Sequence, residues 1–578
     1  MTLESRLDQW SRGWRGPLFA ALVALLAGLP GVFAVPPLDR DESRFAQATS
    51  QMLETGDYVS INYQDQPRDK KPVGIHWMQA ASVALLSDVA DRDIWAYRIP
   101  SLLGAMLAAA ACAWGAAFFF GPRAGLLAGA MMGAGFLLST EAFIAKTDAV
   151  LAGTTTLALA ALGRMYGTLR DGGKPGWRTR LLFWAAVGVA ALVKGPVGPL
   201  VAILAMLAVS AWDSIEARAN RFGWLRHIGW GWGPLLVVAI CGPWAWAITV
   251  ASDGAFWGAA IGGDLAPKLA GGHERHGGIF GYHLLLSPML LFPATLLLPA
   301  GLVLAWKARA EPGVRFALCW LIPTWLMFEL LPTKLAHYTL PAHGALFWLM
   351  AAALREPLGR MSRVAGVVLL GFAALVFSAI AVAALVEYGD GAGDLFWTVV
   401  TVLLFAATAI VGGVVIFRQA AGRALVFAGV VGIVAHAVFF GQLAPRMEPL
   451  WLSQRVELAL ASSNLAPREG VTPGPVEIAG YAEPSLVFAL GTTTGLGGPD
   501  EAVKAIAEGR PAVVEAQEQA AFLAAMKAAG LTPRPVKTVS GVNYSNGDET
   551  RLTLYRGEPQ KTARRVVVPV APLPEVQP

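Results

Sequence analysis

The sequence contains little charge and very few cysteines. Lys, Arg, Asp and Glu together make up 15% of its 578 residues, whereas soluble globular domains have about 25%. Such a shortage of charge excludes an ordinary soluble protein. The three cysteines, Cys112, Cys241 and Cys319, all fall in apolar segments. The sequence therefore contains neither a disulfide framework nor a CxxC metal motif.

Apolar residues replace the missing charge. They account for 55% of the chain, and the mean hydropathy is +0.52, so we predict an all-α protein that crosses the membrane many times. A span needs about 20 apolar residues. Thirteen segments meet this requirement, near residues 17–35, 96–120, 123–140, 147–167, 181–194, 196–211, 233–251, 282–306, 316–331, 337–354, 363–386, 395–417 and 424–443.

Basic residues occur in every second loop between these spans. Examples are Arg123 and the group around Arg170, whereas an alternate loop, 387–394, is acidic. The positive-inside rule places the basic loops in the cytoplasm. Loop topology thus explains the net charge of +5, and we expect no nucleic-acid partner. The first apolar run is longer than the about 7–15 residues of a signal peptide core, which favours a retained anchor over a cleaved signal.

Composition divides the chain into three parts. Residues 1–444 form a membrane domain with external loops at 36–95 and 252–281. Residues 445–560 turn soluble in composition and predict a small α/β domain, with a hairpin signal at Asn546-Gly547. Thirteen spans place this domain outside the cytoplasm. The Pro-rich tail, 561–578, is predicted to be disordered.

The stretch "LDRDESRFAQATSQMLETGD" carries several acids directly after the first span. Its apolar residues, Phe45, Ala48, Met52 and Leu53, have helical spacing and predict an amphipathic helix in the membrane interface. Asp41, near the helix N-terminus and Arg44, is predicted to stay ionised and to accept a proton from a hydroxyl. The alternative is that Asp39 or Asp41 only caps the helix.

Two further groups of charges lie on the same side of the predicted topology. Lys70 and Lys71 follow in the same loop, either as lipid-headgroup anchors or as ligands of a phosphate. Glu141, Lys146 and Asp148 stand between two spans. A charge at a helix centre costs about 2.5–3.5 kcal/mol, so these three must lie at the water boundary, form pairs or line a polar cavity. A structural Lys146–Asp148 pair is the simpler alternative.

Two more groups fall on this side as well. The loop "KLAGGHERHGG" predicts a cationic flap rather than a zinc site, because it lacks the HExxH spacing of a metal helix. The segment "ELLPTKLAHYTLPAH" carries Glu329, Lys334, His337, Tyr338 and His343. Lys194, in "VKGPVG", is interpreted as snorkelling to the external surface. All these groups on one face predict a single external cavity that combines a carboxylate base with several cations.

These residues resemble the GT-C superfamily of polyprenyl-phosphate-dependent glycosyltransferases, in particular the bacterial lipid A aminoarabinose transferases and the protein O-mannosyltransferases. The matching pieces run in order from residue 41 to 341: "DESRFAQATSQMLETGDY", "KKPVGIHWMQAAS", "YRIPSLLGA", "AKTDAVLA", "LVKGPVG" and "PTKLAHYTLP". The resemblance implies that Asp41 is the base, that Arg44 orients it and that Lys71 contacts the lipid phosphate. It also implies that Asp148, the junction aspartate of the "TDA" motif, is a catalytic residue. The chain departs from the family's Glu-Lys-Pro-Pro at Lys70 and from Thr-Lys-Leu-Pro at Ala336.

The resemblance predicts an inverting transfer of a sugar from a polyprenyl monophosphate to lipid A, another glycolipid or another envelope acceptor, on the periplasmic side of the bacterial inner membrane. The binding residues expected for the donor phosphate and substrate are Lys70, Lys71, Lys146, Lys268, Arg275, Lys334, His337 and Tyr338. No cofactor is required, and His273, Glu274 and His276 are weak candidates for a metal. A monomer is expected. The alternatives are a protein O-glycosyltransferase, a lipid-diphosphate-dependent ligase, and a transporter or lipid flippase, although the last would hold its charges near the bilayer midplane.

Overall fold

The computed structural model describes residues 9–38, 40–267, 278–418, 421–466, 474–543 and 545–558. The chain forms two compact units, Met1–Trp451 and Leu452–Pro578. The first unit thus ends at Trp451, whereas the change in composition suggested residue 444. The tail predicted at 561–578 lies outside the described residues.

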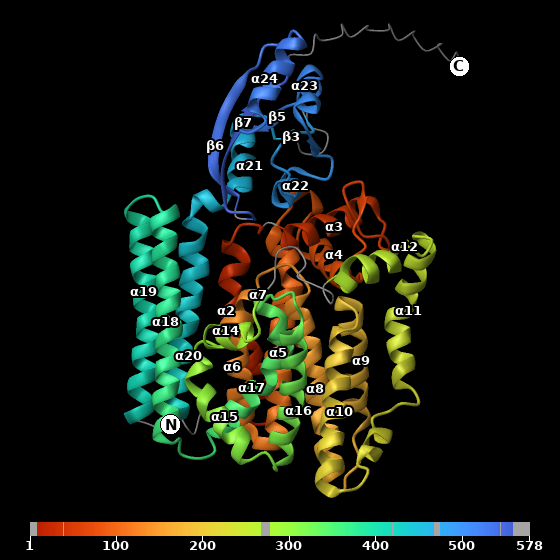
Figure 1. Cartoon of the computed structure of the whole chain (residues 1–578), viewed down its shortest axis with the longest axis vertical. Coiled ribbons are helices and arrows are strands. Elements are labelled where there is room, and N and C mark those ends of the chain that lie inside the picture. Colours follow the sequence, from red (N-terminus) through yellow and green to blue (C-terminus); the bar gives the residue numbers. More distant parts are fainter. Residues whose placement is uncertain are drawn as a thin grey trace, which may run out of the picture. The chain divides into compact units, whose positions relative to one another are not determined.

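The first unit is a helical bundle (Figure 1). Within the described residues, nine helices are long and apolar enough to cross a membrane, and a bent pair raises the number to ten. The nine are α2 (Arg15–Ala34), α5 (Ile94–Phe120), α8 (Asp148–Arg170), α10 (Val197–Ala217), α11 (Gly233–Ala251), α16 (Pro312–Leu330), α18 (Arg360–Tyr388), α19 (Ala392–Arg418) and α20 (Ala421–Val438), the last counted together with the residues to Arg446. The bent pair is α14 (Tyr282–Leu290) with α15 (Leu298–Lys307).

The three other predicted spans are also helical. They correspond to α6 (Pro122–Ala134), α9 (Trp177–Lys194) and α17 (Leu340–Ala353). Two of them are short, with 13 and 14 residues, and α9 carries Arg178, Arg180 and Lys194. A multi-span architecture is therefore established, while the count of thirteen crossings stays a prediction.

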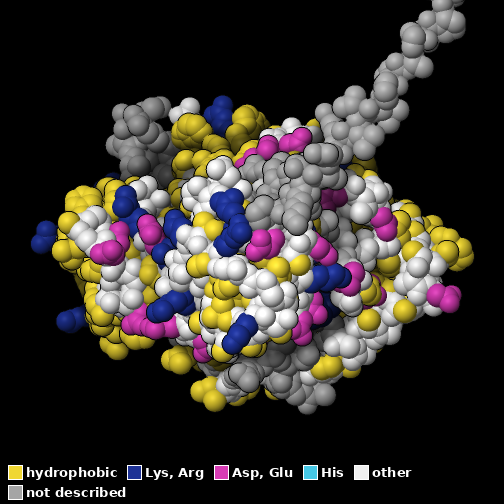
Figure 2. All heavy atoms as spheres, turned by 90° about the horizontal axis from the view of Figure 1, so that it is seen from above, with side chains coloured by type: hydrophobic (Ala, Val, Ile, Leu, Met, Phe, Trp, Pro, Cys, Tyr) yellow, Lys and Arg dark blue, Asp and Glu magenta, His cyan; other side chains and the backbone are white. Residues whose placement is uncertain are grey.

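Side-chain exposure distinguishes the flanks of the bundle from its centre. Leu375 and Leu403, on α18 and α19, are 67% and 61% exposed, as expected where helices face lipid. In the view of Figure 2, acidic and basic side chains are interspersed instead, which is typical of a face in contact with water. α8 lies at the centre of the bundle, and most of its residues are buried.

Small residues allow α8 to approach α5 closely. A Cβ atom on Gly153 would lie 2.4 Å from the carbonyl oxygen of Gly104, and one on Gly104 would lie 2.6 Å from the backbone of Val150. Both distances are too short for any side chain. The two glycines therefore allow α5 and α8 to pack closely, and Asp148 at the start of α8 belongs to the site described below.

Both ends of α8 carry ion pairs. At its C-terminus, Arg170 and Tyr166 donate to Oδ2 of Asp213 over 2.8 and 2.9 Å, and Arg315 of α16 donates to Oδ1 over 2.5 Å. We call these four residues the distal cluster. The 23 residues of α8 separate it by roughly 34 Å from the N-terminal residue Asp148.

Shorter elements lie at the Asp148 end of the long helices (Figure 1). They are α3 (Asp41–Thr55), the strands β1 (Asn62–Tyr63) and β2 (Gln66–Pro67), α4 (Gly74–Leu86), α7 (Phe136–Glu141), α12 (Ala255–Trp257) and the π-helix η3 (Gly258–Leu265). α3 buries Phe45, Ala48 and Met52, which confirms the amphipathic pattern. Asp41 is its first helical residue and Arg40 is the N-cap, so Asp41 does not cap the helix. Asp39 lies outside the described residues.

The second unit is a small α/β domain. Its five-stranded sheet has the order β4-β3-β5-β7-β6. The strands are β3 (Glu477–Ala479), β4 (Gly495–Gly497), β5 (Ala512–Glu515), β6 (Pro535–Asn543) and β7 (Asp548–Tyr555), and the helices are α21 (Leu452–Ser462), α22 (Pro484–Leu490), α23 (Pro499–Ala507) and α24 (Gln519–Ala528). β3 pairs in parallel with β4 and β5, and β7 pairs antiparallel with β5 and β6. The predicted hairpin is present, with Gly547 at φ 85° in its turn.

Candidate active site

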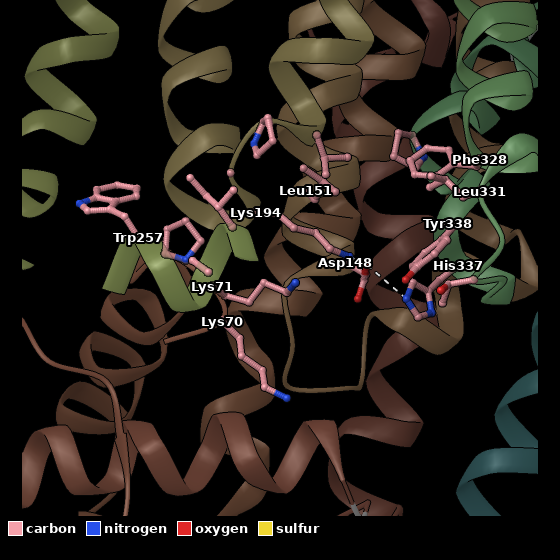
Figure 3. A pocket seen from close by; sticks show the side chains of 18 of the residues that line it. Lys70, Lys71, Asp148, Leu151, Lys194, Trp257, Phe328, Leu331, His337 and Tyr338 are labelled. Atoms are coloured by element: carbon pink, nitrogen blue, oxygen red, sulfur yellow. Dashed lines mark hydrogen bonds and ion pairs between the residues drawn. The ribbon is translucent and has the colours of Figure 1, made fainter. Parts of the chain in front are cut away.

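A cavity of about 220 Å³ opens between α8, α9, α16 and the short elements at the Asp148 end. Figure 3 shows Lys70 and Lys71 on one side of it and His337 and Tyr338 on the other, with Asp148 and Lys194 between them. The residues come from positions 70 to 341 of the chain. Folding thus brings together segments that are far apart in sequence, as the sequence analysis expected for one cavity.

A network of charged side chains surrounds Asp148. Nζ of Lys194 lies 2.5 Å from Oδ1 of Asp148, and Nζ of Lys146 lies 3.6 Å from Oδ2. Nε2 of His337 is 3.6 Å from Oδ1. Lys146 also pairs with Glu141 over 3.1 Å. Since Asp148 is buried, the two lysines offset the cost of removing its charge from water.

The helix ends explain why Lys194 and Asp148 meet. Lys194 is the last residue of α9, and Asp148 is the first residue of α8. A helix C-terminus favours a cation and an N-terminus favours an anion, so each charge is stabilised by its own helix as well as by its partner. Gly195, with φ 60°, ends α9 in a conformation that favours glycine, and Pro196 follows it.

Asp41 lies outside the wall of this cavity but close to the network. Its carboxylate is 3.9 Å from the Arg68 guanidinium, which stacks over the ring of Phe45 at 4.3 Å. Desolvation by neighbouring protein atoms raises the pKa of Asp41, but the charges of Arg68, Lys146 and Arg44 outweigh it and lower the pKa below its ordinary value. The Asp41 side chain is still 66% exposed. It is therefore an ionised carboxylate that a substrate hydroxyl can reach.

The remaining wall of the cavity is apolar. It is formed by α12, η3 and the end of α16, through Phe256, Trp257, Ala260, Ile261, Phe328 and Leu331. Cations and apolar side chains in one cavity suit an amphiphile with an anionic head. The cavity thus combines a cationic part with an apolar part.

Apart from Lys334, the predicted site residues divide into three groups. Lys70, Lys71, Asp148, His337 and Tyr338 line the cavity, and Lys146 joins them through Asp148 and through His337 Nδ1 at 3.4 Å. Asp41 stands beside Arg68, while Arg44 acts on it only as a more distant charge. Lys268, Arg275 and the candidates for a metal, His273, Glu274 and His276, lie outside the described residues. Elsewhere in the described chain, no three His, Cys, Asp or Glu side chains are grouped to hold a metal.

Lys334 has partners other than the cavity. Its Nζ donates to the carbonyl oxygens of Glu329 over 2.6 Å and of Leu331 over 2.8 Å, at the end of α16. Glu329 in turn contacts Nδ1 of His283 at 2.5 Å. His343 is buried in α17 and stacks on Trp325. Lys334 and His343 thus support the wall of the site and are not among its lining residues.

Two residues of the site were not assigned a role from the sequence. Lys194 was interpreted as snorkelling, but its side chain is only 15% exposed and pairs with Asp148. Arg68, rather than Arg44, forms the ion pair with Asp41. For Lys194 the sequence contains a signal. The lysine stands between apolar residues and a Gly-Pro pair, which places it at the end of a helix, and there a buried carboxylate is a favourable partner. For Arg68 the sequence gives no signal that separates it from its charged neighbours.

Comparison with known proteins supports this description. Residues 70–246 match the family described as dolichyl-phosphate-mannose-protein mannosyltransferase. The undecaprenyl phosphate-alpha-4-amino-4-deoxy-L-arabinose arabinosyl transferase of Pseudomonas paraeruginosa is 28% identical over 367 residues, which are 61% of this chain and 63% of that protein. The protein of the same description from Yersinia pestis is 28% identical over 72% of this chain and 76% of its own length.

Solved structures show the same fold. ArnT from Cupriavidus metallidurans bound to undecaprenyl phosphate superposes with a TM-score of 0.72 at 20% identity, covering 94% of this chain and 99% of that one. Its apo state gives a TM-score of 0.70. The chain thus has the fold of this membrane protein. It is similar in sequence to the undecaprenyl phosphate aminoarabinose transferases and similar in fold to ArnT, which agrees with the resemblance seen in the sequence.

Proposed function

We propose that this protein is an integral-membrane glycosyltransferase that moves a sugar from an undecaprenyl-phosphate-linked donor to lipid A. The observation that carries the proposal is the cavity that Lys70, Lys71 and Lys194 line together with apolar side chains, with the ionised Asp41 close by. The printed names of the relatives give 4-amino-4-deoxy-L-arabinose as their sugar. A pentose of this kind is therefore the first donor to test.

The lysines act on the leaving group. As the bond between the anomeric carbon and the phosphate oxygen breaks, negative charge grows on the phosphate, and cations fixed in a poorly solvated cavity stabilise it. A phosphate monoester leaves without an obligatory general acid. Lys71 and Lys194, which both line the cavity near Asp148, are the proposed contacts of this phosphate.

Asp41 acts on the acceptor. It removes the proton of the attacking hydroxyl as the new glycosidic bond forms on the face opposite the phosphate, which inverts the anomeric centre in one displacement. Arg68 keeps the carboxylate ionised for this step. Asp148 is engaged by Lys194 and Lys146 and is assigned to holding the cations in place.

We further propose that the chain lies in a bacterial inner membrane with the site on the periplasmic side. The alternation of basic loops supports this orientation, and nucleotide sugars are not expected outside the cytoplasm. A lipid must then carry the activated sugar to the site. The thirteen crossings and the external position of the soluble unit belong to the same proposal.

The test is transfer by the purified full-length protein in lipid nanodiscs. Undecaprenyl monophosphate and diphosphate donors are each offered with lipid A or with a hydroxyl-bearing peptide, and products are analysed by mass spectrometry. We expect sugar on lipid A from the monophosphate donor, with inverted configuration. Transfer to the peptide would favour a protein O-glycosyltransferase, use of the diphosphate alone would favour a ligase, and no consumption of either donor would contradict the proposal.

A further inference from the structure

Arg98, in α5, is completely buried, and its guanidinium makes six hydrogen bonds. Nε and Nη2 each donate to one carboxylate oxygen of Glu42 over 2.8 Å. The other four bonds go to backbone carbonyl oxygens at and after the end of α2, namely those of Gly31, Val32, Val35 and Pro36. One side chain therefore joins the end of α2 to the start of α3.

Glu42 extends this connection to the Asp148 network. Its side chain is fully buried, its Oε1 accepts the backbone N–H of Ala145 over 2.7 Å, and its Oε2 accepts that of Leu38 over 2.8 Å. Ala145 immediately precedes Lys146, in the segment that leads into α8. The Arg98–Glu42 pair thus ties the segment before Asp41 and the segment before Asp148 to the same point.

Asp41 is the residue next to Glu42 and has no comparable bonds of its own, since its one ion pair among the described residues is the 3.9 Å contact with Arg68. We propose that Arg98 and Glu42 are positioning residues that fix the Asp41 carboxylate relative to Lys146 and Asp148. Neither touches substrate. The inference rests on the proposed role of Asp41 as the base.

A role in folding alone does not account for this arrangement. A buried ion pair adds little net stability compared with apolar packing. Apart from the carbonyl groups of Gly31 and Val32 in the last turn of α2, the partners of this pair belong to the segment before Asp41 or to the segment before Lys146. The buried pair of Arg315 with Asp213, in the distal cluster, provides a matched control because it lies at the opposite end of α8.

The test is a double-mutant cycle on turnover. Asp41→Glu keeps a carboxylate but moves it by one methylene, and Glu42→Gln keeps the shape of the positioning side chain but weakens its bonds. We expect Glu42→Gln to lower kcat about tenfold or more while the KM for the donor stays within about twofold of the unmodified protein. The kcat of the double variant should lie no more than about threefold below the kcat of the less active single variant. Arg98→Lys should show the same pattern.

The control cycle pairs Asp41→Glu with Asp213→Asn. Asp213→Asn should lower the melting temperature of the detergent-solubilised protein, and its effect on turnover should multiply with that of Asp41→Glu. Multiplicative effects for Glu42→Gln as well would overturn the inference. The same holds if Glu42→Gln and Arg98→Lys both fail to fold, because the pair is then only a folding element. Full turnover in both Asp41→Glu and Asp41→Asn would instead remove Asp41 from the proposed function.

Discussion

Nζ of Lys194 lies 2.5 Å from Oδ1 of Asp148, joining the last residue of α9 to the first residue of α8. The pair lies in the wall of the cavity, and Lys146 and His337 contact the same carboxylate. A carboxylate with three such neighbours is unsuited to accepting a proton. It is suited to holding cations where a phosphate binds.

The first prediction concerns this pair. Lys194→Met leaves the buried Asp148 with Lys146 and His337 only, so stability should fall by about 1–3 kcal/mol, less than the ~3–5 kcal/mol expected for an isolated buried charge. Adding Asp148→Asn removes the unpaired charge and should restore part of the loss. Thermal unfolding of the four proteins in detergent measures both effects. A double variant that is less stable than either single variant would contradict the pairing.

Asp41 itself gives the second prediction. Asp41→Asn removes the proton acceptor without removing a cation, so turnover should fall by about 10²–10⁴-fold while binding of the donor lipid is retained. Timed assays of sugar transfer measure turnover, and binding of labelled undecaprenyl phosphate measures the affinity for the donor lipid. Loss of donor binding in Asp41→Asn would place Asp41 in the donor site instead.

The third prediction concerns pH. A base works only when deprotonated, so kcat/KM falls as the pH drops through its pKa. Arg68 holds the pKa of Asp41 below its ordinary value. Arg68→Gln should therefore raise this pKa and move the acidic limb of the profile to higher pH. Arg44→Gln is the matched control and should move it less, because the charge of Arg44 acts more weakly on Asp41. Equal shifts would contradict the assignment of Arg68 as the main partner.

The fourth prediction compares two lysines. Lys71 lines the cavity, so Lys71→Ala should raise the KM for the donor by about 10- to 100-fold, as expected for loss of a charged hydrogen bond to phosphate. Lys334→Ala should leave this KM unchanged and lower the melting temperature, because Lys334 satisfies the carbonyl groups at the end of α16. The reverse result would return Lys334 to the phosphate site.

The fifth prediction concerns orientation. In a variant lacking the three native cysteines, Ala90→Cys should react with a membrane-impermeant maleimide added to spheroplasts, whereas Asp171→Cys should react only after lysis. The reason is that residue 90 lies in a loop predicted to be external and residue 171 in a basic loop. Both positions are exposed in the structure. Labelling of both from outside would contradict the topology.

The sequence predicted the elements that depend on local patterns. The apolar face of α3, with Phe45, Ala48 and Met52, follows from helical spacing, and the hairpin between β6 and β7 follows from Asn546-Gly547. The convergence of Lys71, Asp148 and His337 was predicted because one-sided charge placement and the motif order both indicated a single cavity. In these cases the order and spacing of residues along the chain were sufficient for the prediction.

The pairing of individual side chains could not be predicted in the same way. Lys194 and Lys334 each follow an apolar run, yet one faces a carboxylate of another helix and the other turns back to its own helix end. Arg44 and Arg68 are both near Asp41, and only the fold of β1 and β2 decides which reaches it. Such outcomes depend on distances between helices, which the sequence does not state.

The distal cluster has a consequence for the reaction at the other end of α8. A helix held by ionic contacts at both termini cannot slide along its axis by even one turn, about 5.4 Å, without separating Arg170 from Asp213 or Asp148 from Lys194. In the proposed function, the depth in the bilayer at which the donor phosphate is released is therefore fixed by contacts at both ends of α8. Changes in membrane thickness should be taken up by the lipid-facing helices α18 and α19 and leave the reacting groups at constant depth.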